Sequence, residues 1–287
     1  MTARKSDLDR SAIRIRPLTL GDRAAVRRVV SAATRRDYIP DVFTAWVRDG
    51  GFFGAELDGE LVGLAKLTRM SRTEAFLEGL RVSRRAREHG VGTALIRYRL
   101  DRARSAGMRV ARYVTWSEND VMHRMARRLG FRRVAEDAWL RAPRTAGPEL
   151  RVAGRRDAAA LTALAQGNGR LLRVDHGHHS SRFREITRGD IVDAISERRC
   201  LVLDGSSGPV AFAILGRDRA ETVYLASATR RALGAFARRF RAYARRRPKT
   251  PVYIAVSRVR RAILERAGYR KSGTGYGVVF ERALSER

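Results

Sequence analysis

The alternation of apolar and polar residues divides the chain into two similar halves. Ile13-Arg14-Ile15-Arg16 alternates as in a β-strand, and Asp22 stands where an N-cap would open a helix that runs to about residue 33. Leu150-Arg151-Val152 opens the second half in the same way, before an alanine-rich apolar run. Each half closes with a helix followed by a glycine, and the interval between these glycines, Gly130 and Gly268, nearly equals that between the opening strands. The parallel predicts an internal duplication.

The first half contains the succession of elements that is typical of a mixed sheet. After the opening strand and helix, the predicted elements cover 38–48 (helix), 51–57, 61–70 and 75–82 (strands), 92–105 (helix), 109–115 (strand) and 121–129 (helix), with a final hairpin. Hairpin strands precede a strand-helix-strand unit, so the sheet should contain a parallel pair near its middle. The prediction is an α/β fold of the mixed-sheet (α+β) type.

A linker separates the two halves. The segment Arg141-Ala142-Pro143-Arg144-Thr145-Ala146-Gly147-Pro148 combines two prolines, a glycine and no hydrophobic periodicity. We therefore expect a first domain over 1–141, a linker over 142–149 and a second domain over 150–287.

The composition indicates a folded protein outside the membrane. The 287 residues are 44% hydrophobic, but no apolar run approaches the roughly 18 residues that a membrane span requires. The polar N-terminus lacks the features of a secretory signal, which makes the cytoplasm the expected location. Cys200 is the single cysteine, so internal disulfides and thiolate zinc clusters are ruled out, and we expect this side chain to be buried filler.

The formal net charge of +30 is the extreme feature of the composition. Such a charge favours polyanion binding, yet the arginines are spread over nearly every predicted helix. The densest cluster would form a basic stripe on one helix of the second half, and it comprises Arg238, Arg239, Arg241, Arg245, Arg246 and Arg247. Two interpretations stay open, a solvated helix face or a surface for an acidic or nucleic-acid partner.

The segment from Phe76 to Thr93 carries the most informative chemistry. It passes from a buried strand through a basic, glycine-containing loop into the start of a helix. Glycines let the backbone approach a ligand, and the unpaired amides at the positive end of the helix dipole favour a phosphate. The lysine and hydroxyl residue of a P-loop are missing, and so is the third glycine of a dinucleotide fingerprint. We expect an anion site of another kind.

The loop Arg87-Glu88-His89-Gly90-Val91-Gly92 resembles the R/Q-x-x-G-x-G/A signature of the GNAT superfamily of acetyltransferases. The resemblance implies acetyl-CoA as co-substrate, with its pyrophosphate on the loop amides and its pantetheine arm paired to the preceding strand. The cofactor-binding positions that it implies are Leu80, Arg81 and Val82 in the strand, and Arg87, Glu88, His89, Gly90, Val91, Gly92 and Thr93 in the loop and helix start.

A later motif extends this resemblance. The run from Asn119 to Phe131 is similar to the family's N-x-x-A-x-x-L-Y-x-K-x-G-F, which implies a second CoA contact at Asn119. A plain N-cap is the alternative role of Asn119, and it is compatible with that contact. The family tyrosine that protonates the departing thiolate falls at Ala126, so this role is vacant or is filled from elsewhere.

Glu78 is the expected catalytic residue. It shares a strand face with Phe76, Leu80 and Val82, and a partly desolvated carboxylate accepts a proton near neutral pH more readily. We expect Glu78 to act as general base on the attacking ammonium, directly or through a water molecule. The alternative is a structural ion pair with one of the many arginines.

A narrower resemblance is to the histidine N-acetyltransferase branch, which also carries a second, degenerate GNAT-like half. It rests on Asp37-Tyr38-Ile39-Pro40, on Trp46 and on Leu77-Glu78-Gly79-Leu80-Arg81-Val82. The resemblance implies a free amino acid or a similar small amine as acceptor. Tyr38 and Trp46 would line its pocket, or would simply pack a helix on the sheet.

The second half lacks these chemical features. Its corresponding strand, Thr222-Val223-Tyr224-Leu225-Ala226, has no acid equivalent to Glu78, and no glycine pair follows it. We therefore predict two tandem GNAT-like domains, the second degenerate. Asp175-His176-Gly177-His178-His179 lies where the acceptor-side helices of this half should end. Adjacent loop histidines need distant ligands to hold a metal, so we expect a polar loop or an acceptor contact and no metal.

Three functions stay open. The first is acetyl transfer to a small primary amine. The second is the same chemistry on a protein or on a tRNA-linked amine, guided by the arginine surface. The third is a non-catalytic CoA-sensing or nucleic-acid-binding protein, in which Ala126 marks lost catalysis. Salt-sensitive retention of RNA would favour the last two, and CoA binding without turnover would favour the third.

Overall fold

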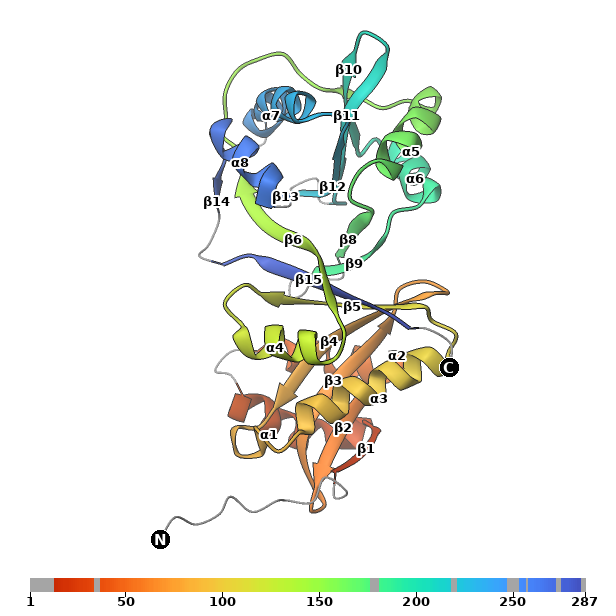
Figure 1. Ribbon diagram of the computed structural model, residues 1–287, viewed down its shortest axis with the longest axis vertical. Coiled ribbons are helices and arrows are strands. Elements are labelled where there is room, and N and C mark those ends of the chain that lie inside the picture. The colour runs from red at the N-terminus through yellow and green to blue at the C-terminus, as the bar shows by residue number, and fades with distance from the viewer. Residues whose placement is uncertain are drawn as a thin grey trace. The chain divides into compact units, whose positions relative to one another are not determined.

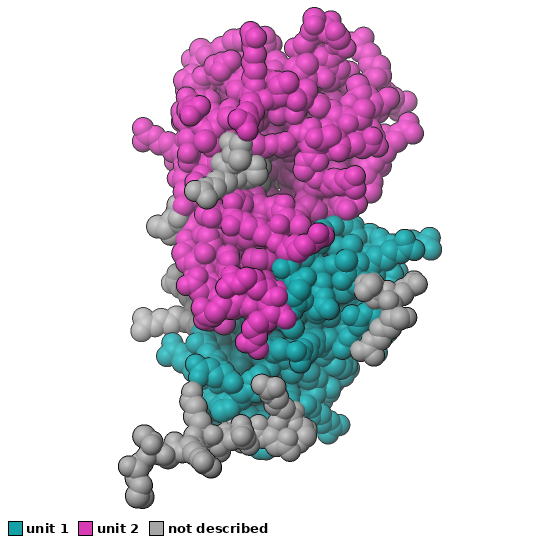
Figure 2. All heavy atoms as spheres, in the orientation of Figure 1, with its two compact units in different colours: residues 1–113, 129–131, 281–287 teal, residues 114–128, 132–280 magenta. Residues whose placement is uncertain are grey.

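The computed structural model describes residues 13–33, 37–175, 181–217, 221–246, 253–256, 258–271 and 275–284. The chain forms two compact units (Figure 2). Unit 1 comprises 1–113, 129–131 and 281–287, and unit 2 comprises 114–128 and 132–280. The boundary between the units runs through two strands, β5 (Val110–Trp116) and β15 (Gly277–Ala283). The linker expected at 142–149, between the two halves of the sequence, stays a prediction.

Unit 1 is a mixed sheet with helices on both faces (Figure 1). Besides its part of β5 and β15, its elements are β1 (Ile13–Pro17), the 3-10 turn η2 (Leu20–Asp22), α1 (Arg23–Ala33), α2 (Ile39–Asp49), β2 (Phe52–Leu57), β3 (Glu60–Arg69), β4 (Glu74–Val82), the 3-10 turn η3 (Arg84–Ala86) and α3 (Val91–Ser105). Strands β1 to β4 pair antiparallel in that order, and β5 joins β4 in parallel. The mixed α/β fold and its parallel pair are thus confirmed.

Local signals in the sequence fix several of these elements. α2 begins where the Asp37 carboxylate accepts a hydrogen bond from the Ile39 amide at 3.0 Å, and Pro40 occupies its first turn. Asp58 and Gly59 have φ values of 52° and 78°. Positive φ at both central residues is the conformation of a two-residue hairpin turn, and here it joins β2 to β3.

Each face of the unit 1 sheet has its own apolar cluster. α1 and α2 cover one face with side chains that include Val26, Val30, Ile39, Phe43 and Trp46. α3 covers the other face with Val91 and Leu95, which pack among residues of β2 and β3. Burial of a large apolar side chain contributes about 1.5–3 kcal/mol. The sheet is therefore clamped from both sides.

Unit 2 repeats this plan with additions. Its elements are α4 (Asp120–Arg128), β6 (Arg132–Arg141), β7 (Arg151–Val152), the 3-10 turn η4 (Arg155–Asp157), α5 (Ala158–Gln166), β8 (Leu171–Asp175), β9 (Ser181–Glu185), α6 (Arg188–Ser196), β10 (Cys200–Gly205), β11 (Gly208–Leu215), β12 (Glu221–Ser227), α7 (Arg230–Arg245), β13 (Tyr253–Val256), α8 (Arg258–Arg266) and β14 (Arg270–Lys271). The strand order is β7-β10-β11-β12-β13-β6, with one parallel pair between β12 and β13. α5 and α6 pack in one apolar cluster, and α7 and α8 in the other.

Both halves of the sequence begin with the same side-chain triad. In each, an arginine of the first strand bonds to a carboxylate six residues later and to a second carboxylate on the next strand of the sheet. The triads are Arg16, Asp22 and Glu56 in unit 1, and Arg151, Asp157 and Asp204 in unit 2. The donor-acceptor distances are 2.7 Å for both bonds in unit 1 and 2.6 Å for both bonds in unit 2. This recurrence supports the internal duplication.

The structure tests the expectations for Cys200 and for the segment that ends at Asp175. Cys200 is fully buried, as expected, and burial raises the pKa of its thiol to about 12. The expectation of helices ending near Asp175 is wrong, because residues 171–175 form β8 and pair antiparallel with β9. The apolar-polar alternation of Leu-Arg-Val-Asp has the period of two that suits a strand.

Candidate active site

The candidate site lies along β4, where this strand loses one of its two neighbours. β4 pairs with β3 over 75–82, but with β5 over 74–76 only. From 77 to 82, the edge toward β5 has no ladder partner among the described residues. Such an edge presents unpaired backbone groups that suit an extended ligand. The strand positions expected to bind cofactor lie in this stretch, and they are Leu80, Arg81 and Val82.

Gly79 distorts β4 within this stretch. Its φ is +63°, and a Cβ at this position would lie 2.6 Å from the Trp46 ring. Glycine therefore permits both the backbone angle and the close approach of the indole. Trp46 is 6% exposed and meets the rings of Tyr38 and Phe52 edge-on. The structure thus shows Trp46 packing α2 on the sheet, and its contact with an acceptor stays a prediction.

Glu78 precedes the distortion and has polar neighbours. Its side chain is in a residue only 7% exposed, and its Oε1 accepts a hydrogen bond from the Thr68 hydroxyl at 2.5 Å. Lys66 stands opposite Glu78 in the β3–β4 register. The register shifts at Gly79, and Leu80 and Val82 pack in the cluster under α3, so the expectation that Glu78 shares a face with these two residues is wrong. The buried Lys66 ammonium donates to the Asp49 carboxylate and to the Gly50 carbonyl. The carboxylate of Glu78 is therefore buried and held in position, as a general base requires.

Arg99 of α3 is buried directly behind this part of the sheet. It is 1% exposed, and its Nη1 donates to the carbonyls of Lys66 and Glu78 at 3.0 and 3.3 Å. Its Nε donates to the Leu95 carbonyl at 3.1 Å. Burial lowers the pKa of the guanidinium to about 9, and the charge of Glu78 opposes that shift. Arg99 therefore stays charged at neutral pH and ties α3 to β3 and β4.

Arg81 is engaged on the α2 side of the sheet. Its Nε donates to the Asp37 carboxylate at 2.5 Å, and its Nη1 donates to the Leu80 carbonyl at 3.0 Å. The Asp37 side chain is 1% exposed, and that of Arg81 is 25% exposed. The Tyr38 ring lies 5.7 Å from the guanidinium carbon. Cofactor contact at Arg81 is therefore expected from its backbone and not from its side chain.

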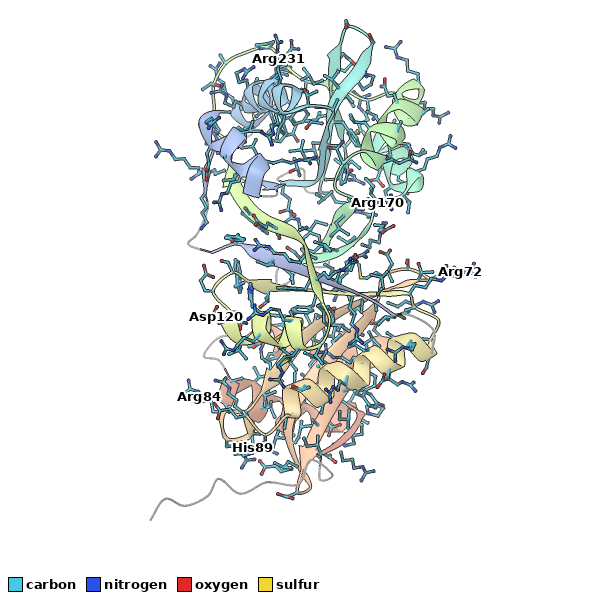
Figure 3. All side chains as sticks on the ribbon, viewed as in Figure 1. Arg72, Arg84, His89, Asp120, Arg170 and Arg231 are labelled. Atoms are coloured by element: carbon cyan, nitrogen blue, oxygen red, sulfur yellow. The ribbon has the colours of Figure 1, made fainter. Side chains whose placement is uncertain are left out.

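The loop between β4 and α3 has the geometry of an anion site. Glu88 and Gly90 have φ values of +70° and +84°, and a Cβ on Gly90 would meet nothing within 4 Å. Gly90 is the N-cap of α3, no side chain caps the helix, and its first turn has no acidic residue. Arg84 and His89 mark this loop in Figure 3. The first amides of α3 and the positive end of its dipole therefore fit a pyrophosphate.

The comparison of sequences agrees with this geometry. Residues 24–131 match the sequence model of the acetyltransferase (GNAT) family. This segment is a GNAT acetyltransferase domain. Acetylation that depends on acetyl-CoA is therefore its chemistry, and the anion loop and the open strand edge fit that co-substrate.

Solved structures extend the likeness over both halves. A GCN5-related N-acetyltransferase from Sphaerobacter thermophilus has 16% identity and a TM-score of 0.61, over 96% of each chain. One from Kribbella flavida has 19% identity and a TM-score of 0.51, over 95% of this chain and 72% of that chain. Ard1 from Thermoplasma volcanium is 27% identical over 44% of this chain and 87% of its own, with a TM-score of 0.42. The first two show the same fold along nearly the whole length.

In the second half, backbone groups at the positions that correspond to the open ones of the GNAT domain are bonded to side chains. Two residues separate β12 from α7, and the Thr229 side chain caps the helix. On β12, the Ser227 amide donates to the Asn168 side chain at 3.1 Å. The Leu225 carbonyl accepts a hydrogen bond from Arg260 at 3.1 Å. One amide of α7 and two backbone groups of β12 thus have side-chain partners from this half itself.

The predicted residues around α4 belong to unit 2. Asn119 caps α4, because its Oδ1 accepts a hydrogen bond from the Met122 amide at 3.3 Å, while its CoA contact stays a prediction. The His123 Nε2 lies 3.1 Å from the Trp116 carbonyl oxygen. Ala126, at the position of the family tyrosine, is 1% exposed. No hydroxyl is available at that position.

Three polar residues beside Glu78 were not predicted, although the sequence contains a signal for each. Lys66 and Thr68 are polar residues two apart in a strand whose other positions are mostly apolar. Arg99 follows Leu95 at the spacing of the buried face of α3. Polar residues at core positions point to a partner that only the folded chain supplies.

Neither a group of metal-ligating side chains nor a membrane-spanning helix is found among the described residues. Among the described residues, no three His, Cys, Asp or Glu side chains are grouped as metal ligands would be. His176, His178 and His179 lie outside the described residues. No helix in the described ranges is long and apolar enough to cross a membrane.

Proposed function

We propose that the GNAT domain acetylates the primary amine of a small, amino-acid-like acceptor, with Glu78 as the general base. One observation carries the proposal: a carboxylate in a residue only 7% exposed stands where β4 loses its β5 partner. The acid and the open strand edge therefore coincide in the same stretch of β4. A site for amine acetylation needs both, one to accept a proton and one to hold the acyl donor.

The chain's own groups bind and orient the two reactants. The amides from Gly90 to Thr93 would hold the pyrophosphate, and the backbone of Leu80 and Val82 would pair with the pantetheine arm. Bound acetyl-CoA supplies the thioester that is attacked. Because the domain would hold both reactants in place, the chemical step avoids the entropy cost of a bimolecular encounter.

Glu78 takes the proton of the acceptor ammonium, directly or through a water molecule. The neutral amine can then form the new C–N bond while the C–S bond breaks and the thiolate leaves, and the nitrogen releases its surplus proton to solvent to give the neutral amide. The Thr68 hydroxyl keeps the carboxylate in place for this transfer. With alanine at position 126, the thiolate takes its proton from another group or from water.

The acceptor class is inferred from the α2 side of the sheet. There the Arg81 guanidinium, 25% exposed, stands beside the Tyr38 ring. A guanidinium suits the carboxylate of an amino acid, and an aromatic ring suits the body of a small ligand. Tyr38 would line the acceptor pocket, while Trp46 would support it through Gly79.

We also infer that the second half binds no cofactor and serves as a degenerate partner of the GNAT domain. The cap on α7 and the bonds of Asn168 and Arg260 to β12 support this inference.

A second candidate keeps the chemistry but changes the acceptor to a protein or a tRNA-linked amine. The exposed arginines of α7 favour it, because they would attract a macromolecular polyanion. A non-catalytic CoA sensor is the third candidate. Turnover of acetyl-CoA would distinguish the two enzymes from this sensor, which would bind CoA without catalysing acetyl transfer.

The decisive experiment measures free-thiol release from acetyl-CoA with amino acids, polyamines and basic peptides as acceptors. We expect release with one small amine, and a loss of about 10²–10⁴-fold in kcat for Glu78→Gln with acetyl-CoA binding retained. Glu60→Gln changes an exposed glutamate of β3 and is the matched control. Unchanged turnover in Glu78→Gln would disprove the assignment of the base. Silence across the panel despite CoA binding would favour the other two candidates.

A further inference from the structure

The solvent-exposed side of α7 is a continuous basic surface. Between Arg230 and Arg246 the sequence has seven arginines and no acidic residue. Six of these arginines are exposed, and we call them the α7 arginine face: Arg230, Arg231, Arg238, Arg239, Arg245 and Arg246. The opposite side of α7 is fixed, because Leu233, Phe236 and Phe240 are buried in the apolar cluster beneath it. The arginine face therefore cannot turn inward.

The spacing of these arginines forms a line. Arg231, Arg238 and Arg245 are seven residues apart, which is close to two helical turns, so they follow one another along one side of α7. With a rise of about 1.5 Å per residue, neighbours in this row are about 10 Å apart and the row is about 20 Å long. Arg231 is labelled at the N-terminal end of α7 in Figure 3. A row of this length matches an extended, repeating anion better than a single one.

The charges of this row are not offset locally. Elsewhere in the chain, arginines such as Arg16, Arg151 and Arg184 pair with carboxylates at 2.7, 2.6 and 2.7 Å. Among the described residues, no carboxylate pairs with an arginine between 230 and 245 of α7. Arg246 pairs with Glu149 at 2.5 Å, with both side chains well exposed. Exposed pairs of this kind contribute little, so an external polyanion could replace Glu149.

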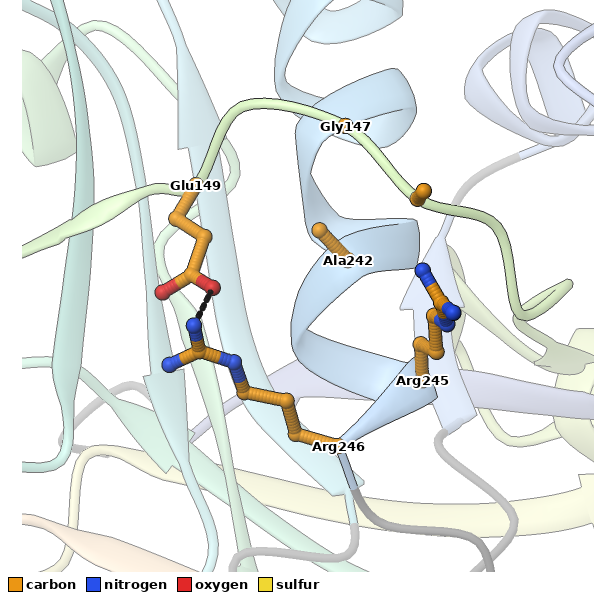
Figure 4. A pocket seen from close by; sticks show the side chains of 6 residues that line it. Gly147, Glu149, Ala242, Arg245 and Arg246 are labelled. Carbon is orange, nitrogen blue, oxygen red and sulfur yellow. Dashed lines mark ion pairs between the residues drawn. The ribbon is translucent and has the colours of Figure 1, made fainter.

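The row ends in a hollow at the C-terminus of α7. This hollow has a volume of about 370 Å³ and is lined by Ala146, Gly147, Glu149, Ala242, Arg245 and Arg246. Figure 4 shows the chain at Gly147 passing over α7, with Arg245 and Arg246 on either side of Ala242. Two guanidinium groups around a small hollow suit a phosphate group that anchors one end of a longer anion.

The surface also indicates what kind of partner it fits. The exposed large hydrophobic residues of the described chain are Leu20, Trp116, Val121, Val134, Val152 and Val192, and none lies on α7. A protein interface needs a buried apolar or aromatic centre, which this face lacks. Base reading by stacking needs exposed aromatic rings, which it also lacks. The α7 arginine face therefore fits a partner that it recognises by regularly spaced negative charges.

We propose that the α7 arginine face binds the phosphate backbone of a nucleic acid, without reading its sequence. This inference goes beyond the proposed acetylation of a small amine and does not depend on it. Arginines bind phosphates through paired N–H donors and release counterions from the nucleic acid. The affinity should therefore fall steeply as the salt concentration rises.

The test compares two triple variants with the same change in net charge. Arg231→Gln, Arg238→Gln and Arg245→Gln together remove the row from α7. Arg27→Gln, Arg28→Gln and Arg102→Gln remove three exposed arginines from α1 and α3 and form the matched control. Binding of labelled RNA and DNA of unrelated sequences is measured over a range of NaCl concentrations. Retained acetyl-CoA binding and an unchanged circular dichroism spectrum show that the variants are folded.

We expect the α7 variant to lose affinity on the order of 10- to 100-fold near physiological salt, with the slope of log K against log salt reduced by about 2 to 3. The control variant should change both quantities much less, and the unrelated sequences should bind alike. Equal losses in the two variants would overturn the proposal, because binding would then reflect only overall charge. A strong preference for one sequence, or equal competition by polyglutamate, would overturn it as well.

Discussion

Arg99 joins the three elements on which the proposed chemistry depends. It belongs to α3, whose N-terminus forms the anion loop, and it bonds to the carbonyl of Glu78 on β4. It also bonds to the carbonyl of Lys66 on β3. A guanidinium can donate several hydrogen bonds in a fixed plane, which a lysine ammonium cannot reproduce. We regard Arg99 as a positioning residue that keeps the base aligned with the cofactor loop.

Arg99→Lys should therefore lower kcat more than it changes binding. We expect kcat to fall about 10-fold or more, with the KM for acetyl-CoA changed by less than about threefold, because misalignment of a base affects mainly the chemical step. Thiol-release kinetics separate the two parameters. Arg97→Lys, on the exposed side of the same helix, is the control. A loss of stability with kcat unchanged would show that Arg99 is only structural.

At the scale of elements, α3 and α7 show how one fold supports a site in one half and not in the other. Both helices follow a central strand and cover the sheet, but the N-cap of α3 is Gly90, and no side chain caps this helix. The N-cap of α7 is Thr229, whose hydroxyl accepts a hydrogen bond from the Ala232 amide at 3.0 Å. A capped helix end has fewer free amides for a ligand. We therefore trace the proposed difference in cofactor binding to the helix N-terminus.

Gly90→Ala tests this role of the loop. The φ of Gly90 is +84°, and a side chain there costs about 1–2 kcal/mol of backbone strain. We expect the altered loop to raise the Kd for acetyl-CoA about 10-fold, measured by calorimetry. Gly107→Ala is matched, because Gly107 has a φ of +74°, equally open surroundings and a position after the other end of α3. Equal effects of the two substitutions would contradict a specific role of Gly90.

At the scale of the whole molecule, the net charge of +30 makes paired carboxylates important for stability. Hydrogen bonds from Arg16 lower the pKa of Asp22 to about 2. Hydrogen bonds from Arg151 likewise hold the pKa values of Asp157 and Asp204 below their usual range. Protonation of these carboxylates removes the partners of the strand arginines and adds to a charge that is already unbalanced.

We therefore expect the protein to be destabilised by acid. A carboxylate whose pKa is lower in the folded state stabilises that state above its unfolded pKa, and the contribution is lost as pH falls toward the folded pKa. The free energy of unfolding should accordingly decrease from about pH 4 down to about pH 2. Urea unfolding at a series of pH values measures it.

A double variant, Asp22→Asn with Asp157→Asn, is the check on this mechanism. It removes one carboxylate from each triad, so it should be less stable near neutral pH and should lose less stability between about pH 4 and about pH 2. If its stability falls with pH as steeply as that of the original protein, these two groups are not responsible for the acid sensitivity.

Several features of the fold could be predicted because they depend on local patterns. The mixed sheet with its parallel pair followed from the periodicity of apolar residues. Cys200 is buried, as was expected of the single cysteine of the chain. The loop glycines predicted an unusual backbone before α3, and the structure shows a positive φ at Gly90, while anion binding there stays a prediction. The strand over 171–175 was missed, because a short alternating segment competes with the helix expected from the duplicated pattern.

The sequence by itself determined most elements of the first half, the basic glycine loop and the membership of residues 24–131 in the GNAT family. These depend on periodicity and on motifs that neighbouring residues define. Only the tertiary structure decided that Thr68 and Arg99 bond to Glu78, and that β4 leaves β5 after residue 76. Such contacts join residues far apart in the chain, and their geometry depends on how strands and helices pack, which no local pattern specifies.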